Sequence, residues 1–137
     1  MGLYLCLFED DEDIDGVEVG TYGDFDAFRS FITDSLESGK PGSRFPTLIL
    51  HSDCDGEWSV QEAVRLADEL ALAREEMRRL PPVPFASEWQ GKIARSNGLT
   101  PRNALESFID VDGECLMERL TALAEHAIAA DLPISFQ

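Results

Sequence analysis

The sequence has few basic residues for its length. Lysine and arginine number 11 against 27 aspartates and glutamates, which gives a formal net charge of −16 over 137 residues. Nucleic acid is bound largely through Lys and Arg on its phosphates, and anionic lipid also repels a negative surface. The charge therefore argues against nucleic acid and membranes as partners and favours a basic protein. The alternative is an acidity that serves only solubility or adaptation to salt.

Cysteine is scarce, and long apolar runs are missing. Cys6, Cys54 and Cys115 are odd in number and have no CxxC spacing, which is typical of reduced thiols in the cytosol. No stretch approaches the roughly 20 apolar residues of a membrane helix. The opening residues 1–8 also lack the basic region and the cleavage site of a secretory signal. We therefore predict a cytoplasmic protein.

Catalytic motifs are missing as well. The chain has two histidines, His51 and His126, and it has neither a Gly-rich phosphate loop nor a G-x-S-x-G or H-E-x-x-H motif. Cys54 follows His51 closely enough to suggest a nucleophile and its base, but an extended strand would point the two side chains to opposite faces. We therefore predict that the protein is not an enzyme and has neither catalytic residues nor a cofactor.

The sequence does have the composition of one folded domain. Hydrophobic residues make up 44% of the chain, with eight Phe among them. A chain of this length and composition can close one sizeable core. We predict a single α+β domain over residues 1–137, with a mixed sheet of about five strands and with helices packed mainly on one face.

Strands are predicted where apolar or alternating runs are bounded by turn residues. Residues 3–8 and 17–19 are expected to form a hairpin with a loop longer than two residues. The run 45–51 is almost wholly apolar, which is typical of an inner strand buried on both faces. Residues 107–109 and 133–136 complete the expected sheet.

Helices are predicted where apolar residues recur at spacings of three and four. Polar residues before these runs have the types and spacings of helix caps. The expected helices are 25–36 with Asp24 as N-cap, a long one that begins at the Ser59–Glu62 capping box, a short one that begins at the Ser87–Gln90 pair, and a last one over 114–128.

The motif Asp-x-Asp-Gly occurs three times, at 13–16, 53–56 and 110–113. The middle copy comes closest to a calcium-binding loop, because Glu62 falls at the twelfth place when the glycines are aligned. However, His51 would then hold the first place, and Glu62 already serves a helix cap. Asp-Gly pairs are common in turns. We therefore interpret the three copies as turns and predict no metal site.

The second and third copies each follow an expected strand. If strands 45–51 and 107–109 are parallel neighbours joined by a helical crossover, their exits lie at the same edge of the sheet. Acidic side chains gathered there would form a surface for a basic partner. We predict that this rim binds the partner and that the first hairpin loop extends it, through Asp53, Asp55, Glu57, Asp110, Asp112, Glu114, Asp10, Asp11 and Glu12.

Residues 2–6, 50–59, 108–114 and 133–137 together resemble the immunity protein 70 family in order and spacing. The resemblance implies an α+β protein of a bacterial polymorphic toxin system, which binds and neutralises the C-terminal domain of a cognate toxin in the cytosol. It implies no catalytic residues. The residues alone leave two other interpretations open. One is an acidic adaptor or regulatory domain for another basic protein, and the other, with less support, is a carboxylate protein that binds calcium or another divalent metal.

The turn interpretation predicts how the protein responds to calcium. Because Asp and Gly at these positions serve turns and caps, millimolar calcium should leave the thermal midpoint unchanged, as measured by differential scanning fluorimetry. A rise of many degrees that Asp55→Ala abolishes would contradict this interpretation.

Overall fold

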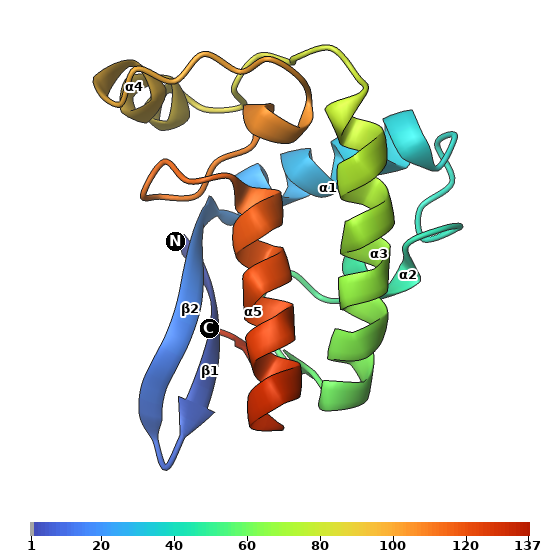
Figure 1. Cartoon of the computed structure of the whole chain (residues 1–137), viewed down its shortest axis with the longest axis vertical. Helices are drawn as coiled ribbons and strands as arrows, with labels where there is room; N and C mark the ends of the chain where they lie inside the picture. Colours follow the sequence, from blue (N-terminus) through green and yellow to red (C-terminus); the bar gives the residue numbers. More distant parts are fainter. Residues whose placement is uncertain (1) are drawn as a thin grey trace.

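The computed structural model describes residues 2–137 (Figure 1). Strands from both ends of this range pair in one sheet. The predicted α+β class is confirmed. In chain order the elements of the described residues are β1 (Gly2–Glu9), β2 (Glu12–Thr21), α1 (Tyr22–Leu36), α2 (Pro46–Ile49), β3 (Glu57–Trp58), α3 (Val60–Arg78), α4 (Glu88–Ser96), the short 3-10 helix η1 (Leu105–Ser107), α5 (Leu116–Ala130) and β4 (Ile134–Phe136).

The four strands found in residues 2–137 pair in the order β2-β1-β4-β3, and each pairing is antiparallel. The predicted strand at 133–136 is confirmed as β4, which lies inside the sheet. Leu5 of β1 pairs with Phe136, and Glu57 of β3 pairs with Ser135. The sheet differs in detail from the expected mixed sheet of about five strands, because two of the expected strands do not form in the described residues.

The first of these is the expected inner strand at 45–51, and this prediction is wrong because the segment contains the short helix α2. Pro46 explains the difference, since proline lacks the N–H that a strand ladder needs and suits the first position of a helix. Two charged side chains form hydrogen bonds with backbone groups at the two ends of this segment. The Glu69 carboxylate accepts N–H groups of the first turn at 3.0 and 3.2 Å. Arg29 donates to three carbonyl oxygens at the other end, the nearest at 2.7 Å.

The second is the expected strand at 107–109, and this prediction is also wrong. Leu105–Ser107 forms η1, and Ile109 makes only an isolated bridge with Cys115. Local side-chain hydrogen bonds favour the turn over a strand. Ser107 Oγ donates to the carbonyl oxygen of Asn103 at 2.9 Å, and the Asn103 side chain accepts a backbone N–H at 3.0 Å.

The hairpin turn is tighter than expected. β1 and β2 are joined by the two residues Asp10 and Asp11, with φ angles of 51° and 64°. Positive φ at both central residues defines the type I′ turn, whose twist matches that of the strands, and aspartate tolerates this conformation. The prediction of a longer loop is therefore wrong, and the acidic run 9–13 belongs to the strands and their turn.

Helix caps follow the predicted patterns with one correction. The N-cap of α1 is Thr21, whose hydroxyl accepts the N–H of Asp24 at 3.0 Å, while the Asp24 carboxylate accepts the N–H of Thr21 at 2.8 Å. Asp24 is thus the third helical residue of a capping box and not the N-cap. The capping boxes predicted at Ser59 and Ser87 are confirmed.

α1, α3 and α5 cover one face of the sheet, as predicted, and α3 runs beside α5 (Figure 1). Leu3, Leu5 and Leu7 of β1 point to this inner face and are at most 1% exposed. His126 of α5 reaches the same face, where its Nδ1 lies 2.8 Å from an Asp15 carboxylate oxygen. None of the helices in residues 2–137 combines the length and the apolar character that a membrane crossing requires.

Phe136 is the main apolar anchor of β4. It is 4% exposed, and its ring stacks on His51 at a centroid distance of 4.1 Å and meets the edge of Trp58 at 4.7 Å. Trp58 belongs to β3 and donates from Nε1 to the Thr47 carbonyl oxygen at 2.9 Å. Phe136 therefore connects the sheet to the loop that carries α2.

Replacing Phe136 by Ala tests this anchor. The lost burial and the cavity should lower the free energy of unfolding by about 3–5 kcal/mol, as measured by urea denaturation. Phe8→Ala is the matched control, because Phe8 lies on β1 with 37% of its surface exposed and should cost about 1 kcal/mol or less. Equal losses in the two variants would contradict the assigned role of β4.

Candidate interaction surface

The predicted acidic rim is not formed. Glu57 lies on β3, at one edge of the sheet. The turn 110–113 lies beyond β2, at the other edge, where Val111 N–H donates to the Glu18 carbonyl oxygen at 3.0 Å. The prediction that these turns share one edge is wrong, because it assumed two parallel strands that do not form. Whether the predicted residues bind a partner stays a prediction.

Asp110 serves the structure of its turn. It is 1% exposed, and its Oδ1 accepts the N–H groups of Asp112 and Glu114 at 2.9 and 3.0 Å. Its other oxygen lies 3.3 Å from Nε of Arg119, which is also 3.3 Å from Glu114. Asp110 is therefore turned away from solvent, whereas Asp112 and Glu114 are exposed.

The loop before β3 has the character of a turn. Asp53 is half-buried, Asp55 and Glu57 are exposed, and Gly56 has a φ of 82°, which favours glycine. Glu62 accepts the N–H of Ser59 at 3.0 Å and so serves the capping box. Among the described residues, no group of three His, Cys, Asp or Glu side chains is arranged to hold a metal ion.

The sheet has a second face, opposite the helices, which we call the outer face. Residues paired across an antiparallel sheet share a face. Tyr4 pairs with Glu18, Cys6 with Gly16 and with Ser135, and Phe8 with Asp13, and Ser135 also pairs with Glu57. The outer face is therefore an apolar stripe along β1 with carboxylates on both sides, made by Tyr4, Cys6, Phe8, Asp13, Gly16, Glu18, Glu57 and Ser135.

Tyr4 lies flat across this face. Its hydroxyl donates to the Asp13 carboxylate, and its ring fills the space where any side chain at Gly16 would stand. Burial and the Asp13 carboxylate both raise the pKa of Tyr4, so the phenol stays neutral. Burial likewise raises the pKa of Cys6 to about 11, which keeps its thiol protonated. The middle of the outer face is thus uncharged.

A hollow of about 250 Å³ lies at one end of the outer face. Tyr4, Glu18 and Val111 line it together with Trp89 of α4. The Trp89 ring packs against Gly20, where an added Cβ would stand 2.7 Å from the ring. The hollow is therefore bordered by the Trp89 ring, by Tyr4 and by the exposed carboxylate of Glu18.

Asp24 holds Trp89 in this position. Its carboxylate is 5% exposed and accepts hydrogen bonds from Trp89 Nε1 at 2.9 Å, from Thr21 and from the hydroxyl of Ser87. Burial alone would raise the pKa of Asp24, but these hydrogen bonds outweigh it and hold the pKa below its usual value. The ionised carboxylate therefore ties α4 to the start of α1.

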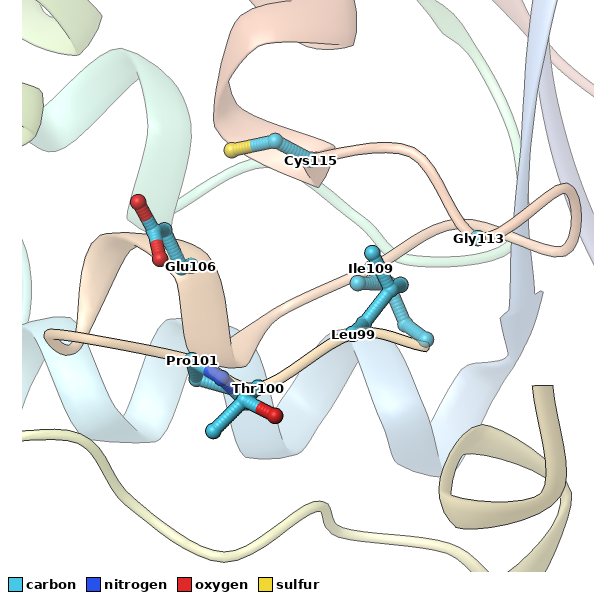
Figure 2. Close-up of a pocket in the computed structure, with 7 residues that line it drawn as sticks. All are labelled: Leu99, Thr100, Pro101, Glu106, Ile109, Gly113 and Cys115. Atoms are coloured by element: carbon cyan, nitrogen blue, oxygen red, sulfur yellow. The ribbon is translucent and has the colours of Figure 1, made fainter. Parts of the chain in front are cut away.

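A smaller hollow of about 130 Å³ lies between the segment 99–101 and Ile109 (Figure 2). Cys115 lines it with a half-buried thiol that lies 3.5 Å from the Leu105 carbonyl oxygen. Burial raises the pKa of this thiol, which makes it a poor nucleophile. The hollow has apolar walls apart from Glu106 and Thr100 and offers no chemistry beyond packing.

Sequence reasoning missed the outer face because residues 3–8 form one apolar run, which is typical of a strand buried on both faces. The alternation Val17-Glu18-Val19 did carry a signal, since it predicts one buried and one solvated face for β2. The positions of Trp89 and Val111 beside this face depend on tertiary packing, and local sequence carries no signal for them.

An apolar stripe between carboxylates has the composition of a protein-binding surface, with an apolar centre and a polar border. The chain belongs to the immunity protein 70 family, whose model matches residues 3–136. It is therefore an immunity protein of a polymorphic toxin system, a non-enzymatic inhibitor that binds a cognate toxin. This confirms the family predicted from sequence. A search of curated proteins and a search of solved structures each found no match.

Asp24→Asn tests the hydrogen bonds that hold α4. The amide cannot accept all of these donors, so the free energy of unfolding at pH 7 should fall by about 1–3 kcal/mol. The folded pKa is depressed, so the ionised form stabilises the fold above the unfolded pKa of about 3.9, and this contribution is lost as pH falls through the folded pKa. The difference between wild type and variant should therefore shrink below about pH 4 in urea denaturation at several pH values.

Asp26→Asn is the matched control on the same helix. The Asp26 side chain is 60% exposed and lies 3.6 Å from Arg29, so its loss should change stability by about 0.5 kcal/mol or less. An equal loss in both variants, or a loss at Asp24 that does not depend on pH, would contradict the network.

Proposed function

We propose that the protein neutralises the C-terminal domain of its cognate toxin in the cytosol of the producing bacterium, by binding a basic surface of the toxin through exposed carboxylates. The family match supports the inhibition of a toxin, and the charge of this chain supports the chemistry of the contact. The observation that carries the proposal is the distribution of charge along the molecule.

The negative charge gathers in the β1–β2 hairpin. Residues 1–28 contain nine acidic and no basic residues, whereas residues 65–102 contain five acidic and seven basic ones. Figure 1 shows the hairpin tip and α4, which lies in the second segment, at opposite ends of the molecule. The protein therefore presents a strongly acidic end, which attracts a basic surface from a distance.

The carboxylates at the hairpin tip are not neutralised by ion pairs within the described residues. Several basic side chains already pair with carboxylates, as in Arg44 with Glu76 and Arg102 with Glu106. In contrast, Asp10, Asp11 and Glu12 are exposed and form no ion pair within the described residues. We propose these three and Glu57 as contacts, with Asp53, Asp55, Asp112 and Glu114 as acidic residues at the two edges of the sheet. Asp110 supports its turn.

Electrostatic attraction suits an inhibitor that must act before a few toxin molecules do harm. Complementary charge raises association rates well above those of neutral surfaces and disfavours wrong partners. Many toxins act on nucleic acid through basic clefts, where carboxylates can take the place of phosphates. Occupation of such a cleft would block the substrate directly.

Co-expression with the toxin domain encoded beside this gene tests the proposal. Cells that carry both should survive, whereas cells with the toxin domain alone should not. In stopped-flow measurements on the purified pair, the association rate constant should fall by roughly tenfold or more as salt rises, because ions screen the steering charge. Failure to protect or to bind would reject the proposed function, and binding without salt dependence would reject its electrostatic part.

A further inference from the structure

We infer that the toxin docks on the outer face of the sheet and that one basic side chain of the toxin enters the hollow between Tyr4 and Trp89. This inference rests on the proposed function and names the surface that performs it. Neither the turn 53–56 nor the turn 110–113 is then the centre of the contact.

The sheet offers a face to a partner and not an edge. At the β2 edge, Arg119 Nη2 donates to the Gly16 carbonyl oxygen at 2.8 Å, and Val111 N–H occupies the Glu18 carbonyl oxygen at 3.0 Å. At the other edge, β3 has only two residues, Glu57 and Trp58. Addition of a strand from a partner needs a row of free backbone groups. Contact through side chains on the outer face has no such requirement.

The outer face has the anatomy of a binding site for a basic protein. The accessible part of its centre is Tyr4, which is half-buried, and Phe8, which is 37% exposed, while Cys6 between them is fully buried. Carboxylates lie on both sides, with Glu18 towards β2 and Glu57 on β3. None of the residues that define this face is Lys or Arg. Apolar contact surrounded by one sign of charge fits a partner with an apolar centre and a basic border.

The hollow fits a single basic side chain. Its volume of about 250 Å³ is below the roughly 300 Å³ at which small-molecule sites begin. Trp89 supplies an aromatic ring, which attracts Arg and Lys, Glu18 supplies the opposite charge, and Tyr4 also lines the hollow. Tyr and Trp are also the residues that most often dominate binding energy in protein interfaces. Asp24 keeps Trp89 in place before binding, which lowers the entropy that the contact costs.

The outer face continues into the acidic hairpin tip. Phe8 pairs with Asp13, and the next pair, Glu9 with Glu12, leads into the turn at Asp10 and Asp11. Figure 1 shows this tip projecting past the ends of α3 and α5. A toxin seated on the outer face can therefore contact the tip at the same time. The tip adds attraction over distance, and the hollow adds close contact.

Charge reversal on the outer face tests this inference. Glu18→Lys and Asp68→Lys make the same change of charge, on the outer face and on the exposed side of α3 respectively. Both should fold with unchanged circular dichroism. Surface plasmon resonance with the purified toxin domain should show an affinity at least about 30-fold lower for Glu18→Lys, mostly through a faster dissociation rate. Asp68→Lys should alter only the association rate and by a few-fold.

A second pair of variants tests the hollow itself. Val111 is 36% exposed at the hollow, and Leu72 is 59% exposed on α3. Val111→Lys places a positive charge where the toxin's basic side chain is expected, so it should weaken binding by at least about 30-fold and abolish protection in co-expression. Leu72→Lys adds the same charge elsewhere and should protect cells as wild type does.

The outcomes separate this inference from the function on which it rests. If the wild-type protein binds and protects while Glu18→Lys and Val111→Lys bind as tightly as their controls, the docking surface is wrong and the toxin inhibitor remains. If only Glu18→Lys weakens binding, the face is supported and the occupied hollow is rejected. If the wild-type protein neither binds nor protects, the proposed function fails first.

Discussion

The insertion of β4 between β1 and β3 is the constraint on which the rest of the structure depends. Leu5 pairs with Phe136 and Cys6 with Ser135 across nearly the whole chain, so the sheet cannot close until everything between them has folded back. Such closure costs entropy before any contact stabilises it. The burial of Phe136 against His51 and Trp58 offsets that cost. The same contacts fix the loop around α2 against the sheet.

The same constraint creates two unlike faces. The helices that connect the strands lie on the inner face and bury the leucines of β1, while the outer face keeps a thin apolar stripe with acidic sides. A strand that is apolar on both faces, as 3–8 is, would be an aggregation hazard if its second face were wholly open. Tyr4 lying over Gly16 and the flanking carboxylates reduce this hazard without closing the surface to a partner.

The sequence predicted correctly those elements that are determined by interactions between residues close together in the chain. The helices that begin at Ser59 and Ser87, α5, the hairpin strands and β4 follow from caps, periodicity and apolar runs. The failures at 45–51 and 107–109 have a common origin, because both segments are apolar but are fixed by distant or competing polar groups. Glu69 and Arg29, which lie on other helices, form hydrogen bonds with backbone groups of the α2 segment. The Asn103 side chain accepts a backbone N–H of η1 and so favours a helical turn over a strand. The candidate rim failed with those strands, since its geometry depended on them, whereas its acidic character depended only on composition.

Charge and shape have different parts in the proposed contact with the toxin. The acidic composition was evident from the sequence, and in the proposed contact it determines which partners are attracted and how fast they arrive. It does not select one toxin among several basic ones, because exposed carboxylates in water contribute little energy individually. Selection needs groups that exclude water and fit one shape, and in our proposal the hollow lined by Tyr4 and Trp89 supplies such groups. The position of Trp89 depends on Asp24, a capping-box residue of α1 that also binds α4. Changes of loop sequence around α4 could therefore alter the specificity of the hollow while the sheet and its charge stay the same.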